Sequence, residues 1–490
     1  MKFIIVIPLF LTLFSGAAVC QTNRPDWKEF DNRPVAEWYK DAKFGIFITW
    51  GVYSVPAFAP KGNYAEWYQF WLQQKSFKGV VADYHQKVYG DKTYYQLAND
   101  FKAELFNPDE WAALFEKSGA KYIVPVAKHH DGFTWWYSKE ADEHWGFPWN
   151  ATEVGPKRDL LGDLLNAVRK TSVKPGVYCS LFEWYNPLYK KNPEQYALTH
   201  VIPQMKELIT KYKPYVLWTD GDWDDSDTTW HSVDFLNWLY HESPMKDSIV
   251  TYDRWGKGIR FKHGNVYTPE YQPDMDFGDH YFEESRGIGF SYGYNRVEDS
   301  WDYNSSQTLI LLLSDLVSRG GNFLLNVGPD RHGKIPPVMQ ERLLDIGAWL
   351  KTNGEAIYNT RKWKQTCQWS AGRRDYKPVR EEGDFKANGD FILKQTIDPP
   401  KGYAAKEVFF TYNPKKNNLY AILPKLPSKN ELVLKDIVLP KGTVVRWIAN
   451  NQILKWQTKD KNTIVTLPAF SNNAFKQQAA YTIKIENFGK

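Results

Sequence analysis

Short apolar runs alternate with longer amphipathic segments from about residue 41 to residue 358, and this alternation limits the possible folds more than any other feature. The apolar runs predict strands at residues 44–48, 122–126, 176–181, 215–218, 249–252 and 323–327. The segments between them predict helices, among them residues 108–118, 160–170, 203–211 and 308–318. Strands that alternate with helices form a parallel α/β sheet, and this length favours a (β/α) TIM-like barrel, in regular or distorted form.

The pattern changes after residue 358, where helical periodicity fades and short β-rich runs with regular turns begin. They predict an antiparallel β-sandwich. The runs are residues 407–412, 418–423, 431–439, 443–448, 463–467 and 480–485. We therefore expect a signal peptide at residues 1–20, a catalytic barrel domain at 21–360 and a C-terminal β-sandwich domain at 361–490. The charged segment 373–404 is expected to be an exposed loop.

The beginning of the chain predicts export. Lys2 precedes an apolar run at residues 3–14, and small residues follow at 15–18, as in a secretory signal peptide. No later stretch is long enough to span a bilayer as a helix. Cys20 offers a site for a lipid anchor, but Val19 is a poor fit to the small residue that such a site requires. A periplasmic or extracellular protein without an anchor is therefore favoured.

Composition excludes some partners. The charge of +5 is small against 62 basic and 57 acidic residues, and no basic block occurs, so no nucleic-acid partner is expected. Beyond the leader only Cys179 and Cys367 remain, which is not a disulfide framework, so stability must come from a core. Aromatic residues make up 16% of the chain, which suits sugar recognition and equally suits a large aromatic core.

Candidate reactive residues follow the predicted strands, because a barrel carries its site on the loops at the carboxyl ends of its strands. These loops begin with Thr-Trp-Gly at 49–51, Lys-His-His-Asp-Gly at 128–132, Ser-Leu-Phe-Glu-Trp at 180–184, Trp-Thr-Asp-Gly-Asp-Trp at 218–223 and Asp-Arg-Trp-Gly at 253–256. Acids, histidines, arginine and tryptophans thus converge on one face. Such a pocket suits a small polyol ring better than a lipid or a nucleotide.

Asp220 is the acid that this pattern favours as a catalytic group. It directly follows a buried run, and Gly221 lets the chain turn away, so that the carboxylate faces the pocket. The alternative role is a helix N-cap, a position that Asp favours. Asp222, the neighbour most easily confused with it, fits a cap of the following segment.

Cleavage of a glycoside needs a second carboxyl group, which protonates the leaving oxygen while the first is ionised. The long loop after the fifth predicted strand offers Glu270, Asp279, Glu283 and Glu284. Glu270 has a stiff and aromatic setting in the sequence Thr-Pro-Glu-Tyr. Spacing does not choose among these acids.

The adjacent pair His129 and His130 at a strand end has two interpretations. For a metal site, no third ligand lies at the usual spacing, and adjacent side chains diverge on an extended segment. Hydrogen bonding to sugar hydroxyls fits better, so no metal is expected. Arg254 fits either a structural ion pair or a role in the site. Residues 320–322, Gly-Gly-Asn, precede a strand and not a helix, so they do not form a phosphate loop, and no cofactor is expected.

These segments together resemble glycoside hydrolase family 29, the α-L-fucosidases. The resemblance runs in order from about residue 35 to residue 358, and its stretches are residues 44–48, 50–56, 66–68, 128–133, 157–160, 180–184, 218–221, 253–256 and 321–329. It implies an exo-acting, retaining enzyme that removes terminal α-L-fucose from a fucosylated glycan by double displacement. It also implies a barrel followed by a β-sandwich.

The resemblance assigns roles by position. Asp220 matches the nucleophile, and Glu270 fits the place of the acid/base in members whose loop reads Thr-x-Glu-Tyr, with Glu283 as the second choice. The residues that it places at the sugar site are Thr49, Glu66, Trp67, His129, His130, Trp218, Arg254 and Tyr292. Retention implies that the two carboxyl groups lie about 5–5.5 Å apart.

Two positions depart from the family pattern. Thr49 stands where the family usually has a His that contacts the sugar, and Cys179 interrupts what is Tyr-Tyr-Ser in many members. Loss of a buried hydrogen bond costs about 1–3 kcal/mol when the partner is left unsatisfied. We therefore expect weak or relaxed fucosidase activity that extends to related pyranosides such as β-D-galactosides.

Three alternatives remain open at this stage. One is a glycosidase of the same fold that acts on another pyranoside, another is a catalytically inactive carbohydrate-binding protein, and the third is a metal-dependent hydrolase. The presence of both Asp220 and Glu270 argues against the second. No oligomeric state follows from the sequence.

Overall fold

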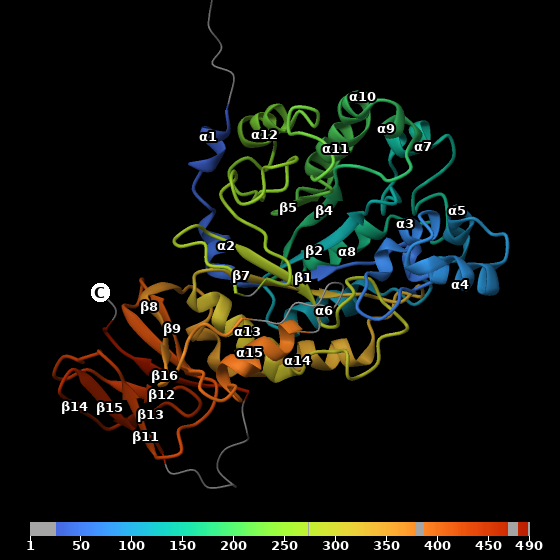
Figure 1. Ribbon diagram of the computed structural model, residues 1–490. Coiled ribbons are helices and arrows are strands. Elements are labelled where there is room, and N and C mark those ends of the chain that lie inside the picture. Colours follow the sequence, from blue (N-terminus) through green and yellow to red (C-terminus); the bar gives the residue numbers. More distant parts are fainter. Residues whose placement is uncertain (1–25, 273, 378–386, 469–478, 489–490) are drawn as a thin grey trace, which may run out of the picture.

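The computed structural model describes residues 26–272, 274–377, 387–468 and 479–488. A curled parallel sheet wrapped by helices forms the blue-to-yellow body of Figure 1, and antiparallel sheets form the orange and red part near the C-terminus. This arrangement confirms the predicted fold class. The predicted signal peptide and Cys20 lie outside the described residues.

The parallel sheet follows the order β5-β4-β2-β1-β7-β6, and the short β3 pairs with β2. Apart from β6, which the sequence analysis did not predict, and β3, each strand falls on or beside a predicted one. The strands are β1 (Phe44–Ile48), β2 (Tyr122–Lys128), β3 (Lys174–Pro175), β4 (Val177–Ser180), β5 (Leu217–Asp220), β6 (Glu283–Gly287) and β7 (Asn322–Val327).

Two further segments take strand positions without forming regular strands. Val250 makes one parallel bridge to Val216, just before β5, and residues 267–270 meet β6 and its preceding residue at two parallel bridges. The predicted strand 249–252 is therefore reduced to a single bridge. These segments bring the curled sheet close to a closed barrel.

Side-chain hydrogen bonds connect residues 253–254, which follow the first of these segments, with residues 267–270. Arg254 donates to Thr268 twice, from Nε to the hydroxyl at 2.7 Å and from Nη2 to the carbonyl oxygen at 3.0 Å. The Thr268 hydroxyl in turn donates to Asp253 at 2.6 Å. We call residues 253–254 and 267–270 the seam; both segments lead into the site described below.

Alternate residues of the strands face opposite sides, as strand geometry requires. In β1, Phe44, Ile46 and Ile48 pack toward the helices, whereas Phe47 packs inside the barrel. Gly45 also faces inward, against the ring of Tyr122, where an added Cβ would lie 2.4 Å from the nearest ring atom. The barrel interior is thus filled by side chains and is not a pore.

Helices cover the outside of the sheet (Figure 1). In α6, Pro108 occupies the first turn, Asp109 and Glu110 follow, and the Asn107 side chain accepts from the backbone of both acids, so this N-terminus is capped as its sequence predicts. The main helices are α4 (Val80–Tyr89), α6 (Pro108–Lys117), α8 (Leu160–Val168), α11 (Ile202–Tyr212), α12 (Ser232–His241), α13 (Ser306–Ser318) and α14 (Pro337–Asn353).

Shorter helices fill the loops. They are α1 (Trp27–Asp31), α2 (Glu37–Ala42), α3 (Tyr68–Gln73), α5 (Tyr94–Leu97), α7 (Lys139–Trp145), α9 (Pro187–Lys191), α10 (Pro193–Tyr196), η1 (Val52–Ser54), η2 (Ala65–Trp67), η3 (Phe77–Gly79), η4 (Ala98–Asp100), η5 (Ala197–Val201) and η6 (Gly354–Ala356). Within the described ranges, no helix has the length and apolar character needed to cross a membrane.

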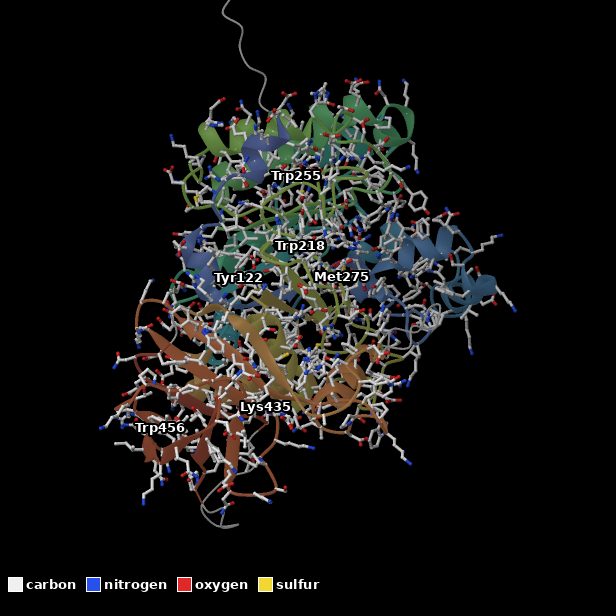
Figure 2. All side chains as sticks on the ribbon, turned by 60° about the vertical axis from the view of Figure 1, so that its left-hand side comes forward. Tyr122, Trp218, Trp255, Met275, Lys435 and Trp456 are labelled. Atoms are coloured by element: carbon white, nitrogen blue, oxygen red, sulfur yellow. The ribbon has the colours of Figure 1, made fainter. Side chains whose placement is uncertain are left out.

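The C-terminal part consists of two antiparallel sheets. One has the order β13-β12-β16-β10-β9-β8 and the other the order β11-β15-β14, and side chains from both share a hydrophobic cluster. Figure 2 marks this part with Lys435 and Trp456, and the barrel with Tyr122, Trp218 and Trp255. The strands are β8 (Arg361–Trp369), β9 (Lys406–Asn413), β10 (Asn418–Leu423), β11 (Glu431–Leu434), β12 (Val445–Trp447), β13 (Gln452–Leu454), β14 (Trp456–Lys459), β15 (Asn462–Thr466) and β16 (Tyr481–Ile485).

The segment expected to be an exposed loop contains a helix, α15 (Ala387–Thr396), so that expectation was wrong for this stretch. Phe391 and Ile392 of this helix are buried, and Ile392 joins the hydrophobic cluster of the barrel helices. Phe409 and Tyr420 of the antiparallel sheet join the same cluster. The barrel and the C-terminal sheets therefore pack through a shared apolar layer, and a domain boundary near residue 360 stays a prediction.

Candidate active site

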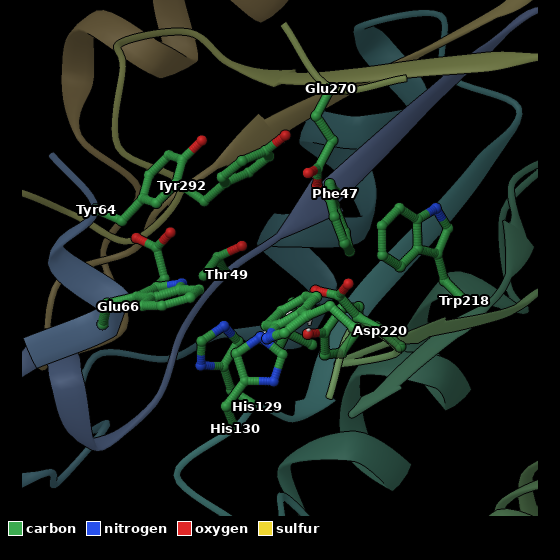
Figure 3. Close-up of a pocket in the computed structure, with 14 residues that line it drawn as sticks. Phe47, Thr49, Tyr64, Glu66, His129, His130, Trp218, Asp220, Glu270 and Tyr292 are labelled. Carbon is green, nitrogen blue, oxygen red and sulfur yellow. Dashed lines mark hydrogen bonds and ion pairs between the residues drawn. The ribbon is translucent and has the colours of Figure 1, made fainter. Parts of the chain in front are cut away.

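A pocket of about 100 Å³ lies at the carboxyl ends of the parallel strands (Figure 3). About 10–15 Å³ is enough for one water molecule, so this pocket has room for a ligand the size of one small ring. Its lining residues are Phe47, Thr49, Tyr64, Glu66, Trp67, Val126, His129, His130, Tyr178, Trp218, Asp220, Trp223, Glu270 and Tyr292. The predicted site residues all belong to this lining, except Arg254 and Glu283.

Asp220 ends strand β5 and is the most heavily hydrogen-bonded carboxylate of the pocket. Its Oδ1 accepts from Arg254 Nη1 at 2.8 Å and from Arg260 Nη2 at 3.1 Å. Its Oδ2 accepts from the Tyr178 hydroxyl at 3.0 Å and lies 3.5 Å from Nε2 of His130. Side chains from several elements thus fix the carboxylate, a different setting from that of a helix cap.

Two opposing influences act on the pKa of Asp220. Burial raises it, but the positive charge of Arg254 and the hydrogen bond from His130 outweigh burial and hold the pKa well below its usual range. The Arg260 charge acts in the same direction. The carboxylate is therefore ionised at neutral pH, as a nucleophile requires.

The neighbouring acid, Asp222, has a different role from the cap that its sequence position suggested. It binds Arg260 in a bidentate pair, with Nη2 2.6 Å from Oδ1 and Nε 2.9 Å from Oδ2. Asp222 therefore positions Arg260 against Asp220. Sequence analysis missed Arg260, because it lies in no recognisable motif; its only signal was a basic residue in the loop after the fifth predicted strand.

Glu270 approaches the pocket from the side opposite Asp220 and points toward it in Figure 3. Its Oε2 lies 3.3 Å from Nη2 of Arg254, whose other terminal nitrogen binds Asp220. One guanidinium therefore contacts both carboxyl groups. The Glu270 side chain remains 30% exposed, so a bound ligand and water can both reach it.

Glu283, the second choice for the acid/base, lies outside the pocket lining. It is fully buried inside the barrel, where its Oε2 accepts hydrogen bonds from Tyr39 at 2.6 Å and from Tyr122, and its Oε1 from Trp218 at 3.3 Å. Burial raises its pKa. Glu283 therefore supports Trp218 from below and has no path to a ligand in the pocket.

The remaining candidates for the acid/base, Glu284 and Asp279, also lie outside the pocket lining. Glu284 forms a buried ion pair with Arg286 on the same strand. The Asp279 side chain is 98% exposed and pairs with Lys362. Of the acids that the sequence left open, only Glu270 lines the pocket with Asp220.

Glu66 closes another side of the pocket. Its Oε2 accepts from the backbone of Gly293 at 2.8 Å and from the Ser291 hydroxyl at 3.1 Å. Burial, the largest influence, raises the pKa of Glu66 to about 7 despite these hydrogen bonds. Near neutral pH this side chain can therefore both accept and donate hydrogen bonds.

The two histidines have distinct surroundings. Nδ1 of His130 lies 2.6 Å from the Ser180 hydroxyl, which itself donates to the Phe182 carbonyl, so Nδ1 donates to that hydroxyl while Nε2 faces Asp220. Burial, and then the neighbouring His130, hold the pKa of His129 well below its usual range, so this ring is neutral. Its Nδ1 is buried without a hydrogen-bond partner among the described residues. In the same part of the chain, no group of three or more His, Cys, Asp or Glu is arranged to hold a metal ion.

The two residues that depart from the family pattern, Thr49 and Cys179, have different surroundings. Thr49 lines the pocket, and its hydroxyl donates to Asn326 Oδ1 at 2.7 Å. Cys179 points away from the pocket into the cluster under the helices, whereas its neighbours Tyr178 and Ser180 point toward Asp220 and His130. Of these two residues, Thr49 lines the pocket and Cys179 does not.

Comparisons with known proteins agree over most of the chain. The sequence profile of the family described as Alpha-L-fucosidase matches residues 13–355, and that of the Alpha-L-fucosidase C-terminal domain matches residues 401–486. Alpha-L-fucosidase of Dictyostelium discoideum is 38% identical over 447 residues, which cover 89% of this chain and 87% of that protein. Tissue alpha-L-fucosidase of Homo sapiens is 37% identical over 499 residues, 97% of this chain and 96% of that protein.

Solved structures give the same result. The crystal structure of Thermotoga maritima alpha-fucosidase matches with a TM-score of 0.74 at 33% identity, covering 94% of this chain and 99% of that one. The same protein in complex with a mechanism-based inhibitor matches with a TM-score of 0.74 at 32% identity and the same coverage.

Proposed function

Because the chain belongs to the α-L-fucosidase family, glycoside hydrolase family 29, we propose that its pocket removes terminal α-L-fucose from fucosylated glycans, with Asp220 as nucleophile and Glu270 as acid/base. The observation that carries this assignment is the contact of one guanidinium, that of Arg254, with both carboxyl groups across a pocket the size of one sugar ring. The same residues favour hydrolysis over a binding role alone.

The first half of the reaction forms a glycosyl ester. A carboxylate oxygen of Asp220 attacks the anomeric carbon while Glu270 gives its proton to the glycosidic oxygen, and the bond between that carbon and oxygen breaks. The aglycone leaves with the proton of Glu270. Arg254 stabilises the charge that moves from one carboxyl group to the other, because it contacts both.

The second half releases the sugar. Glu270, now ionised, takes a proton from water, the oxygen of that water attacks the anomeric carbon, and the ester to Asp220 breaks. Two inversions give net retention. The 30% exposure of the Glu270 side chain allows this water to reach it.

The other pocket residues would hold the sugar. The buried Nδ1 of His129 lacks a partner among the described residues, and Glu66 can donate or accept near neutral pH, so both can bind sugar hydroxyls. Trp67 and Trp218 offer ring faces for the apolar side of the sugar. A pocket of this size accepts one terminal residue, which supports exo action.

Release of 4-nitrophenol from 4-nitrophenyl α-L-fucoside and from the β-D-galactoside tests the proposal, with wild type and Asp220→Ala side by side. Turnover of the fucoside that disappears in the variant supports both the reaction and the nucleophile. Fucoside turnover that survives in Asp220→Ala would refute this nucleophile, and no turnover of either substrate by the wild type would refute the reaction.

We also propose that the protein is exported, with cleavage of residues 1–20 and without a lipid anchor. Support comes from the charged, apolar and small-residue sequence of the leader. N-terminal sequencing of the secreted protein should give a start close to residue 21. Incorporation of labelled fatty acid that is lost in Cys20→Ser would instead show an anchor.

A further inference from the structure

A second cleft of about 500 Å³ lies beside the pocket and is separated from it by aromatic rings. Tyr64 and Tyr292 line the pocket, whereas Phe290 and Tyr271 line the cleft. The rings of Tyr64 and Phe290 stack with centroids 5.0 Å apart, and those of Tyr271 and Tyr292 meet edge to face at 5.5 Å. The two cavities therefore share a wall one ring pair thick.

At this wall, the side chains of two consecutive residues line different cavities. Glu270 lines the pocket, and Tyr271, which follows it, lines the cleft. Tyr271 has a φ of 50°, a left-handed conformation that is uncommon for a bulky residue. Its hydroxyl accepts from the backbone of Gly287 at 2.8 Å and donates to the carbonyl of Phe290, which holds the strained residue in place.

Trp301, on the loop between β6 and α13, lines the cleft and is 92% exposed, more than any other large apolar side chain of the described ranges. The loop that carries it contacts a neighbouring segment, because Lys61 pairs with Asp299 at 2.6 Å and with Asp302 at 2.7 Å. Asp299 also accepts from the backbone of Trp301 at 2.9 Å. A large ring face held out in solvent on an anchored loop is a stacking platform for a flat apolar ligand face.

Arg286 supplies a polar anchor at the same cleft. It is fully buried, and its Nε and Nη2 bind Glu284, but its buried Nη1 has no hydrogen-bond partner among the described residues. A buried donor without an acceptor is unfavourable, and an oxygen bound in the cleft would satisfy it. This feature points to a ligand with hydroxyl groups.

The charge of the cleft limits the ligand further. Both of its cations are paired with carboxylates, Arg286 with Glu284 and Lys61 with both Asp299 and Asp302, and Asp390 adds a further negative charge. An anionic sugar would be repelled. We propose that this cleft binds a neutral sugar of the glycan that carries the fucose, stacked on Trp301 and hydrogen-bonded to Nη1 of Arg286.

The proposal rests on the proposed function for the identity of the glycan. In the proposed reaction Glu270 protonates the leaving oxygen, and its neighbour Tyr271 lines the cleft, so we place the next sugars of the aglycone on the side of the cleft. The cleft would therefore strengthen binding of an extended glycan and leave a small aryl fucoside unaffected.

Steady-state kinetics of Trp301→Ala with fucosyllactose and with 4-nitrophenyl α-L-fucoside test this. Loss of one stacking contact should raise KM for fucosyllactose about tenfold, equivalent to about 1.4 kcal/mol, with little change for the aryl fucoside. Trp301→Phe should fall between. The control is Ile453→Ala, which removes an exposed apolar side chain from β13 and should change neither substrate. Equal effects on both substrates, or none on fucosyllactose, would overturn the proposal.

A binding experiment tests this proposal independently of the proposed function. Calorimetry of the wild type with a panel of unfucosylated neutral glycans (lactose, N-acetyllactosamine and chitotriose) should show binding of at least one, weakened about tenfold in Trp301→Ala, and weaker binding of sialyllactose. This result stands even if no fucoside is hydrolysed. No binding of any glycan, or a change of oligomeric mass in Trp301→Ala without an effect on glycans, would overturn it.

Discussion

The Tyr178 hydroxyl on β4 donates a 3.0 Å hydrogen bond to Oδ2 of Asp220 on the adjacent strand β5. Backbone pairing of Ser180 with Asp220 fixes the register between these strands, so the phenol reaches the carboxylate from two residue pairs below, on the same face of the sheet. The guanidinium groups of Arg254 and Arg260 bind Oδ1 of Asp220, and the Tyr178 hydroxyl binds Oδ2. Because both oxygens are held, the orientation of the carboxylate plane is fixed.

Tyr178→Phe should therefore lower activity. A hydrogen bond to a charged group is worth about 1.5–3 kcal/mol, which corresponds to a fall in kcat/KM on 4-nitrophenyl fucoside of about 10- to 100-fold. The matched control is Cys179→Ala on the same strand, whose side chain faces the helices. Activity loss in the control equal to that in Tyr178→Phe would show a general effect of strand packing.

Glu270→Gln should slow the enzyme in proportion to the difficulty of the leaving group. A general acid contributes about 10²- to 10⁴-fold, and the contribution shrinks when the aglycone leaves easily as a nitrophenolate. We expect a large loss on fucosyllactose and a smaller loss on 4-nitrophenyl fucoside. Glu283→Gln, the comparison variant, should lose stability without this dependence; the reverse pattern would move the acid/base role to Glu283.

Glu66 should make stability depend on pH. Burial raises its pKa to about 7, above the value of 4.5 expected for an exposed Glu, so the folded protein holds the proton more tightly than the unfolded chain. This contribution is fully present below pH 4.5 and is lost as pH rises through 7, a change of about 3 kcal/mol. Urea unfolding at pH 5 and pH 8 should show a smaller pH effect in Glu66→Gln than in wild type. Identical pH effects in the two proteins would contradict this account.

Glu183 should be essential for stability. It is fully buried with Lys128 at 3.0 Å and His200 at 2.7 Å, directly behind the pocket histidines. Although burial raises its pKa, these partners hold it well below the usual range, so its stabilisation is present above the unfolded pKa and is lost as pH falls. Glu183→Gln leaves the Lys128 charge unpaired and should cost about 3–5 kcal/mol by chemical denaturation. Asp109→Asn, which breaks the exposed pair with Lys170, should cost less than about 1 kcal/mol.

Thr49→His should raise turnover of 4-nitrophenyl α-L-fucoside relative to the β-D-galactoside. The longer side chain would restore a donor toward the sugar, worth about 1–3 kcal/mol, although it gives up the hydrogen bond from Thr49 to Asn326. The ratio of the two rates is the measurement. No change in the ratio, or a fall, would count against a role of Thr49 in sugar specificity.

The apolar strands could be predicted from the sequence because continuous apolar runs have few other uses in a domain of this kind. Residues 44–48 coincide with β1, and residues 418–423 with β10. Strand β6 could not be found in this way, because it reads Glu-Glu-Ser-Arg-Gly and yet is buried throughout. Tyrosine hydroxyls from distant segments satisfy Glu283 inside the barrel, and an ion pair within the strand, Glu284 with Arg286, satisfies the charges on the outer side.

The seam shows a second limit of predicting strands from the sequence. Ile249–Tyr252 reads as a strand, but beyond Val250 the partner is a side-chain network between Arg254 and Thr268, which leaves no ladder for the segment to join. In α15, Phe391 and Ile392 are buried against the barrel helices, a contact that a charged surrounding sequence does not reveal.

The residues of the candidate site could be predicted from the sequence more fully than the boundaries of the helices and strands. Strand ends located Asp220, His129 and His130 from position alone, because parallel strands present their carboxyl ends on one face. Arg260 and Tyr178 were not singled out for the site, since the first lies in an irregular loop and the second inside a strand. Their contacts with Asp220 depend on tertiary packing.

The double contact of Arg254 also has a consequence for the electrical balance of the pocket. In the proposed reaction, one negative charge resides first on Asp220 and then on Glu270, and the same cation adjoins both positions. The counterion therefore does not have to move when the charge does. The pocket keeps a constant net charge from the resting state to the ester, so the negative charge changes its position while the entry and release of a neutral sugar leave the total charge unaltered.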